Sequence, residues 1–294
     1  CLKAVIPINV FKLNPPLFIL RSRFLYSRIT FLSEEKLCLA DHDIPFSNKR
    51  NFNNMWNITS RELNSFFSNA TGYIVIVIFL LSTSLLLWVF PGDYNILDMG
   101  YANIGGLFTL TPWLYLFLCP AVTMKMFAEE KQSGTIELLL TRPISPWKIV
   151  CGKALAGWLL VIIALLPTLI WALSIYYISD PVGNMDMGAF WGSWLGLVFL
   201  AMVYVCIGLF GSSISKNQIV AFIISALLCF VLFYGFELLG SLFSGDIAYI
   251  LKNIGIRQHC LSISRGVIDS RDLLYFIFGS SIFLYITKLI ITKK

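Results

Sequence analysis

Six long apolar segments constrain the fold of this chain more than any other feature. They cover residues 72–90, 104–124, 149–178, 189–211, 217–239 and 273–291. About 20 apolar residues in a helix cross a ~30 Å hydrocarbon layer, so each segment can span a membrane. Hydrophobic residues make up 57% of the 294 residues and charged residues only 13%, with a mean hydropathy of +0.78. The sequence therefore predicts an all-α polytopic membrane protein with six transmembrane helices.

The third apolar segment is the longest. Shortly before it, Ser145 is suited to cap a helix and Pro146 to occupy the first turn of that helix. A helix from Pro146 to residue 178 would be about 50 Å long at 1.5 Å per residue. We therefore expect it to project beyond the hydrocarbon layer into the preceding charged loop.

Lysine and arginine in the loops indicate the orientation. Ten lie on one side, namely Arg61, Lys125, Lys131, Arg142, Lys148, Lys153, Lys216, Lys288, Lys293 and Lys294. The loops at 91–106 and 179–188 contain none, whereas the long loop at 240–272 has four that are partly balanced by aspartates. The charge pattern predicts a multi-pass membrane protein with both termini in the cytoplasm.

Residues 1–54 differ from the rest of the chain. They contain none of its 7 methionines, 20 glycines or 8 tryptophans, and they have no long apolar run. We interpret them as a non-native or upstream-translated extension that precedes Met55; a disordered or partner-binding arm is the alternative. The domain expected from the sequence is residues 55–294.

An amphipathic pattern follows Met55. Trp56, Thr59, Leu63 and Phe66 recur at helical spacing, while polar residues occupy the other face. The pattern predicts an N-terminal helix that lies in the membrane interface before the first span.

Residues 125–148 form a dense charged segment between the second and third spans. Gly134 supplies a left-handed position that ends a helix, and Thr135 can cap a new one with Glu137 near its positive end. We expect a short cytoplasmic helix at the membrane surface. The alternative is a surface loop solvated by Glu129, Glu130 and Lys131.

Small and charged residues near the other spans give weaker signals. Gly192, Gly196 and Gly208 lie in the fourth span and predict close helix packing, either within the subunit or across a dimer. Glu237, Arg265 and Asp269 lie at the expected outer side, where they could form a gate or partner contact or serve structural roles.

Several kinds of chemistry find no support. No phosphate-binding loop, serine-nucleophile motif or zinc-protease motif occurs, and the chain has only 2 histidines. Most of the 7 cysteines lie in or beside apolar runs, and only Cys260 looks exposed. Residues 1–54 carry +4 of the net charge of +6. We predict no enzyme activity, no metal or cofactor on this chain, and no nucleic-acid partner.

The charged segment resembles a known signature. Phe127-Ala-Glu-Glu-Lys-Gln-Ser-Gly-Thr-Ile-Glu-Leu-Leu-Leu-Thr-Arg-Pro-Ile-Ser is similar to the coupling loop of ABC-2 type transporter permeases. Residues 55–294 as a whole resemble the gliding-motility-associated permease subunit (GldF-like). The segments that carry this second resemblance are Met55-Trp-Asn-Ile, Pro181-Val-Gly-Asn, Lys216-Asn-Gln-Ile-Val-Ala-Phe and Ser262-Ile-Ser-Arg-Gly-Val-Ile-Asp-Ser-Arg-Asp.

The resemblance implies a six-span permease of the bacterial inner membrane that works with a separate cytoplasmic ABC ATPase, which binds the ATP and Mg. It implies that the short helix after Gly134 is the coupling helix. It also implies a second permease subunit, identical or homologous, and a membrane component with a large outer domain. The residues expected to couple to the ATPase are Glu129, Glu130, Gly134, Thr135, Glu137, Leu138, Thr141, Arg142 and Pro143.

The expected function is the membrane-spanning subunit of an ATP-driven ABC-2 type transporter associated with gliding motility. A permease for another export task or for metalloenzyme maturation is the nearest alternative. A non-transporting membrane scaffold is the rival from a different class. The substrate and the direction of transport do not follow from the sequence.

Overall fold

The computed structural model describes residues 47–98, 100, 104–140, 144–243, 245–264 and 269–292. Every regular element in these ranges is helical. The chain divides into two compact units, residues 1–50 and 51–294, and the account below concerns the second. Residues 1–46 lie outside the described residues, so the interpretation of residues 1–54 stays a prediction.

Six helices of this unit are long and apolar enough to cross a membrane, which confirms the predicted all-α polytopic fold. They are Ala70–Val89, Gly105–Gln132, Pro146–Ile178, Met187–Ile214, Gln218–Leu242 and Ser270–Thr292. Several of these helices are longer than the apolar segments that predicted them, because polar residues continue the helix beyond the apolar segment. The clearest case is the second span, which continues about eight residues beyond the apolar segment that predicted it.

The second, fourth and sixth spans are the single helices α4 (Gly105–Gln132), α8 (Met187–Ile214) and α13 (Ser270–Thr292). The others are composite: α3 (Ala70–Ser84) with the π-helical turn η1 (Leu85–Val89), α6 (Pro146–Leu165) with α7 (Thr168–Ile178), and α9 (Gln218–Phe230) with η2 (Val231–Gly235) and α10 (Phe236–Leu242). Pro167 separates α6 from α7 because it has no N–H to continue the hydrogen-bond ladder.

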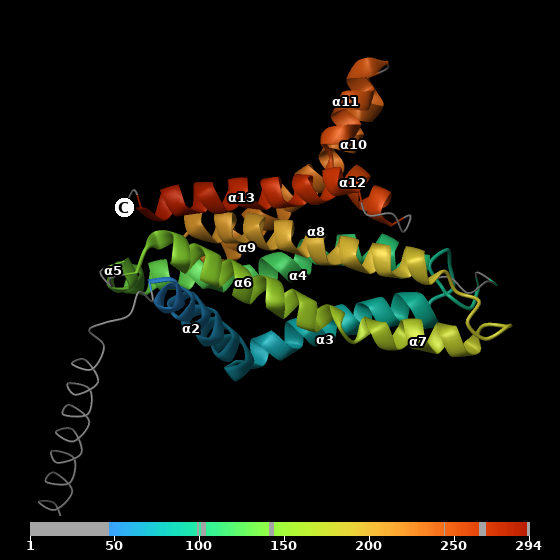
Figure 1. Ribbon diagram of the computed structural model, residues 1–294, viewed down its shortest axis with the longest axis horizontal. Coiled ribbons are helices and arrows are strands. Elements are labelled where there is room, and N and C mark those ends of the chain that lie inside the picture. The colour runs from blue at the N-terminus through green and yellow to red at the C-terminus, as the bar shows by residue number, and fades with distance from the viewer. Residues whose placement is uncertain are drawn as a thin grey trace, which may run out of the picture. The chain divides into compact units, whose positions relative to one another are not determined.

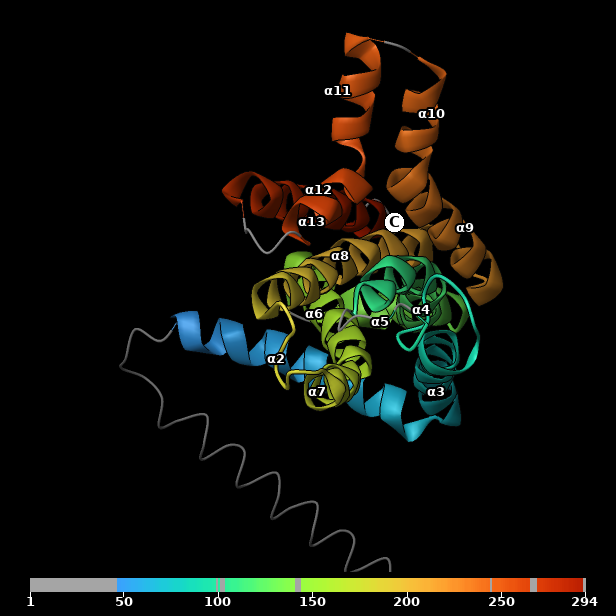
Figure 2. The same ribbon diagram turned by 90° about the vertical axis from the view of Figure 1, so that its right-hand side faces the viewer.

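Four further helices complete the unit: α2 (Ser47–Ser68), α5 (Thr135–Leu140), α11 (Asp246–Ile254) and α12 (Ile256–Ile263). The end of α13 lies at the same end of the bundle as α5, and the α3–α4 and α7–α8 connections lie at the opposite end (Figure 1). The hairpin of α10 and α11 projects sideways from the bundle (Figures 1 and 2).

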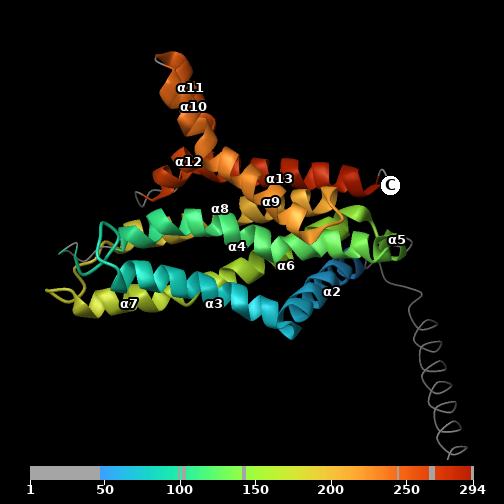
Figure 3. The same cartoon turned by 180° about the vertical axis from the view of Figure 1, so that it is seen from behind.

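Helix α2 differs from its prediction in two ways. It begins at Ser47 instead of near Met55, so one helix runs through the expected domain boundary. Trp56 is exposed, whereas Ile58 and Thr59 are buried against α6, with Thr59 Oγ1 donating to the Gly152 carbonyl at 3.0 Å. Thr59, Leu63 and Phe66 of the predicted stripe do face the core, so the predicted inner face is largely confirmed and Trp56 is the exception. The helix runs obliquely beside the α5 end of the bundle (Figure 3).

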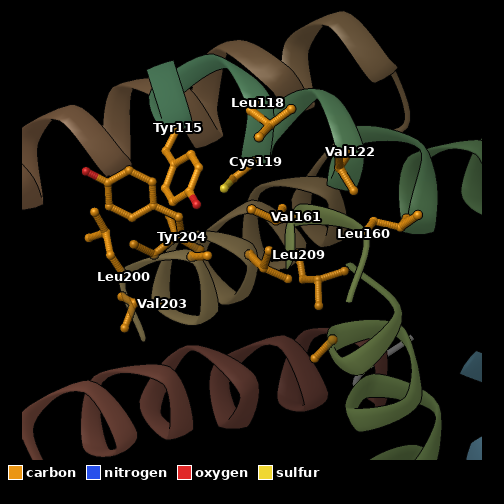
Figure 4. Packing of buried hydrophobic residues seen from close by; sticks show 14 of the residues in the cluster. Tyr115, Leu118, Cys119, Val122, Leu160, Val161, Leu200, Val203, Tyr204 and Leu209 are labelled. Carbon is orange, nitrogen blue, oxygen red and sulfur yellow. The ribbon is translucent and has the colours of Figure 1, made fainter. Parts of the chain in front are cut away.

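The core is built around α8, which packs against α4, α6, α9, α12 and α13. Tyr204, Leu200 and Leu209 of α8 are fully buried, as are Tyr115 and Cys119 of α4. Figure 4 shows these side chains in one cluster with Leu160 and Val161 of α6. Since lipid gives little hydrophobic drive between helices, this contact depends on close van der Waals packing.

Small residues of α8 permit that packing. A Cβ placed on Gly208 would overlap the Thr123 side chain of α4, and one on Gly211 would overlap Ser225 of α9. Gly192 is buried too, and Gly196 lies against Ile263 of α12. The contacts of Gly196, Gly208 and Gly211 are thus made inside the chain.

Gly208→Ala should destabilise the protein by about 1–3 kcal/mol, because the added methyl group has no space beside Thr123. Gly279→Ala is a matched control: this glycine also lies in a spanning helix, α13, but its Cβ position is open. The midpoint of thermal unfolding in detergent should fall for the first variant and stay nearly unchanged for the second. Equal midpoints for the two variants would contradict the assignment of Gly208 to a close helix contact.

Candidate functional site

The second span carries the chain into the charged segment. α4 continues to Gln132, and Ser133 Oγ then donates to the Glu129 carbonyl at 2.8 Å. Gly134 follows with a φ of 73°, a left-handed conformation that a side chain disfavours. The chain therefore reverses at Gly134, and α5 begins at the next residue.

Helix α5 is held against the end of α4. The Thr135 hydroxyl lies 2.9 Å from Ser133 Oγ and donates to the Glu130 carbonyl. This hydrogen bond links the start of α5 to the end of α4. Ile136 packs against the main core, and Glu137 is exposed in the first turn. Of the other predicted coupling residues, the side chain of Leu138 and the whole of Thr141, Arg142 and Pro143 lie outside the described residues.

The most unusual group near this loop is Lys153, which belongs to the first turns of α6. Its side chain is only 1% exposed although it carries a charge. Its Nζ lies 3.0 Å from Oε1 of Glu62 and 2.9 Å from Oε1 of Glu130, and it donates to the Met126 carbonyl at 2.7 Å. A buried ammonium is tolerated only when it is paired and hydrogen-bonded in this way.

Arg61 completes this network at its solvent-exposed edge. Its Nη2 lies 2.8 Å from Glu62 Oε1 and 3.2 Å from Glu130 Oε1, and its side chain is 51% exposed. We call Arg61, Glu62, Glu130 and Lys153 the charge joint. It connects α2, α4 and α6, which are the three helices that meet beside α5.

The carboxylate of Glu62 titrates below its ordinary range. Burial alone would raise its pKa, but the charges and hydrogen bonds of Lys153 and Arg61 outweigh burial, so the pKa is lowered from 4.5. The hydrogen bond to Glu62 raises the pKa of Arg61. Because the folded pKa of Glu62 is depressed, its contribution to stability is present above pH 4.5 and is lost as the pH falls below that value.

A second set of bonds fixes the end of α4 to the end of α8. The Ser212 hydroxyl of α8 accepts from the backbone N–H groups of Phe127 and Ala128, both at 3.1 Å, and donates to the Met124 carbonyl at 3.0 Å. Lys131 donates to the Ser213 carbonyl. The segment of α4 that leads to α5 is therefore fastened to the central helix as well as to the charge joint.

The charge joint changes the role assigned to Glu130. The sequence suggested that Glu129 and Glu130 both face a partner, but Glu130 pairs with Lys153 and Arg61 of its own chain. Glu129 is the exposed one of the two. Lys153 enters the expectations from the sequence only as a charge that orients the chain in the membrane. A lysine one turn inside an otherwise apolar run also indicates that its charge needs a buried partner, and this signal could have pointed to the charge joint.

The predicted outer residues do not form one cluster. Glu237 pairs with Arg257, and Asp269 is exposed and accepts from the Arg271 N–H at 3.0 Å as part of the cap of α13. Arg265 lies outside the described residues. Cys260, expected to be exposed, is only partly exposed and packs against the core, and burial raises its pKa to about 12.

A partly buried pair that the sequence did not reveal joins α12 and α13. His259 Nδ1 lies 2.7 Å from Asp272 Oδ1, and His259 Nε2 lies 2.9 Å from the Asn253 carbonyl. The Tyr275 ring stacks on His259 at 3.9 Å. The part of the chain that the structure describes holds no group of three or more His, Cys, Asp or Glu arranged for a metal ion, so this pair reads as a structural link between α11, α12 and α13.

Lys153→Met should be strongly destabilising, by about 3–5 kcal/mol, because it leaves Glu62 and Glu130 half-buried with only Arg61 to balance them. Lys216→Met is the matched control, since Lys216 is exposed at the α8–α9 connection. The double variant Lys153→Met with Glu130→Gln should recover part of the loss, because one unpaired charge is removed. Thermal unfolding of the three purified proteins checks this; a Lys153→Met protein as stable as Lys216→Met would show that the joint contributes nothing.

Comparison with known protein families matches residues 96–264 to the family described as ABC-2 family transporter protein. The match covers α4 through α12, and so contains Glu130, Gly134 and Lys153, whereas α2 and α13 lie outside it. A search of curated proteins found no relative that matches the chain.

The matched region is more than half of the chain and contains α4, α5 and α6, which carry Glu130 and Lys153 of the charge joint. Six spanning helices and this match agree on a multi-pass membrane protein of a transporter. The chain therefore belongs to the family of ABC-2 family transporter proteins.

Proposed function

We propose that this chain is the permease of an ATP-driven transporter in which a separate cytoplasmic ATPase binds and hydrolyses ATP with Mg. In this proposal α5 is the coupling helix, and closure of the ATPase pushes on it. The observation that carries the proposal is the attachment of α5 to the end of α4, which the charge joint fastens to α2 and α6 and the Ser212 bonds fasten to α8.

Force on α5 needs a stiff path into the membrane. α4 is one continuous helix of 28 residues, and the third span has 33 residues, so both extend well beyond what a ~30 Å hydrocarbon layer requires. Lys153 fastens these two helices together close to α5. A push at α5 would move the cytoplasmic ends of both spans as one body.

Two exposed carboxylates are the proposed contacts for cations of the ATPase. Glu137 lies in the first turn of α5, and Glu129 lies one turn before the reversal at Gly134. Charged groups at the rim of an interface steer association and set specificity. Glu130 is excluded from this role because its carboxylate is used inside the chain.

The finer assignment rests on the resemblance of residues 55–294 to gliding-motility permease subunits. On that basis we propose an inner-membrane complex with two permease subunits, identical or homologous, one ATPase, and a membrane component with a large outer domain. Purification of the intact complex and identification of its members tests this assignment. Recovery of a metalloenzyme-maturation or other export system in place of motility proteins would redirect it, and recovery without any ATPase would favour a scaffold.

Gly134→Val should weaken binding of the ATPase or uncouple hydrolysis from transport, because a β-branched side chain strains the left-handed turn by roughly 1 kcal/mol or more. Gly245→Val is the matched control: Gly245 has a φ of 76° and open space around its Cβ position, but it lies in the α10–α11 connection. Co-purification of the ATPase and its stimulated hydrolysis rate should fall only for Gly134→Val. If both variants behave like wild type, the segment is a solvated connector.

Glu137→Lys should reduce ATPase co-purification by about tenfold while leaving unfolding of the permease unchanged, because Glu137 is exposed and reversing an interface charge costs a few kcal/mol. Glu62→Lys should instead lower the unfolding midpoint, since Glu62 belongs to the charge joint. A pair of variants with the same phenotype would argue against separate roles for these two carboxylates.

The proposed orientation places α5 in the cytoplasm. Asp93→Cys, in the exposed α3–α4 connection, should react in intact cells with a thiol reagent that cannot cross the membrane. Lys216→Cys should react only after the cells are opened, because the α8–α9 connection lies at the α5 end of the bundle (Figure 1). The reverse pattern of labelling would invert the orientation and place α5 outside.

A further inference from the structure

A cavity of about 540 Å³ lies between α2, the start of α3 and the last turns of α4. One wall carries Arg61, Glu62 and Phe66, and the other carries Lys125, Met126 and Glu129. The charge joint forms part of its inner wall but does not fill it. The coupling role proposed above makes no use of this space.

The cavity crosses the level at which the first span enters the membrane. Thr71 and Val75 of α3 line it, and the neighbouring Tyr73, Ile74 and Val77 are exposed on an uncharged helix that crosses the membrane. At its other end the cavity reaches Ser133 and Thr135 beside the coupling helix. It therefore joins the lipid-facing surface of α3 to the water-facing turn at Gly134.

The lining has the two kinds of surface that an amphipathic molecule requires. Phe66, Val75, Val122 and Met126 supply an apolar part, and the charged side chains supply a polar part. A membrane phospholipid has this division between acyl chains and headgroup, and it is available wherever α3 faces lipid.

The charged side chains around the cavity determine which kind of lipid headgroup fits best. The cavity and the joint behind it contain three cations, Arg61, Lys125 and Lys153, and three carboxylates, Glu62, Glu129 and Glu130. Within this balanced set, Lys125 donates to the Thr71 hydroxyl at 3.0 Å, and Glu129 is exposed. A balanced lining suits a zwitterionic headgroup better than an anionic one, because a net negative ligand would leave the carboxylates uncompensated.

The wall also favours a headgroup that donates hydrogen bonds. Glu129 offers an exposed carboxylate, and Oε2 of Glu130 is buried without a hydrogen-bond partner among the residues the structure describes. A primary ammonium has three N–H donors, whereas a quaternary choline has none.

We propose that this cavity binds an inner-leaflet phospholipid with a primary-amine headgroup, its phosphate beside Lys125 and Arg61 and its ammonium beside Glu129. The lipid would then occupy the space between the interfacial helix α2 and the base of the coupling helix. The site is independent of ATPase binding, so it can be tested on the permease alone.

The test measures lipid binding to the full-length purified chain in detergent, through the rise of its unfolding midpoint during titration with phosphatidylethanolamine, phosphatidylcholine or phosphatidylglycerol of identical acyl chains. Phosphatidylethanolamine should bind most tightly. Lys125→Gln should weaken its binding by about tenfold, because a charge-assisted contact to phosphate is lost. Lys216→Gln, which removes an exposed cation from the same end of the bundle but outside the cavity, should have no effect.

Each other outcome overturns the proposal. Equal binding of the ethanolamine and choline lipids would show that the amine is not recognised, and tighter binding of phosphatidylglycerol would show an anionic-lipid site. An equal effect of Lys125→Gln and Lys216→Gln would place the lipid elsewhere. Stabilisation by water-soluble glycerophosphoethanolamine alone, at the same concentrations, would show that the ligand is a soluble phosphate compound and not a lipid.

Discussion

The arrangement at the α5 end depends on one buried charge. Lys153 lies inside a spanning helix with 1% of its side chain exposed, and an ammonium in that position is stable only if carboxylates and a carbonyl surround it. Glu62 must therefore come from α2 and Glu130 from α4, which fixes where the interfacial helix crosses and how far the second span extends. The same contacts leave Arg61 at the surface and create the cavity beside α2. One requirement of charge pairing thus sets the positions of three helices.

The rest of the bundle is held by close packing around α8. Because the membrane offers little gain for bringing apolar helices together, the short contacts at Gly208 and Gly211, the fully buried tyrosines and the Ser212 hydrogen bonds carry the association. These contacts tie α4 to α8 over most of its length. Motion that begins at α5 would therefore be passed to the central helix, which is the mechanical property that the proposed coupling needs.

The sequence was sufficient for the spans and the reversal at Gly134, because apolar length and glycine conformation are local properties. It was insufficient for the charge joint, since Glu62, Glu130 and Lys153 are far apart in the chain and only tertiary packing brings them together. The periodic pattern placed most of the buried face of α2 correctly, but it missed Ile58, which is buried by a tertiary contact with α6 that such a pattern does not encode. The hairpin of α10 and α11 also escaped prediction, because α10 continues the fifth span while α11 and α12 are too short to stand out in hydropathy.

The two ends of the bundle solve the problem of buried polar groups differently. At the α5 end the charge joint pairs Lys153 and Arg61 with the carboxylates of Glu62 and Glu130. At the other end both ring nitrogens of His259 face oxygen acceptors, the Asp272 carboxylate and the Asn253 carbonyl. The link between α11, α12 and α13 thus rests on one side-chain pair and one carbonyl, whereas the link between α2, α4 and α6 uses four charged side chains and the Met126 carbonyl. More contacts must therefore break before the helices beside α5 separate than before α11, α12 and α13 do.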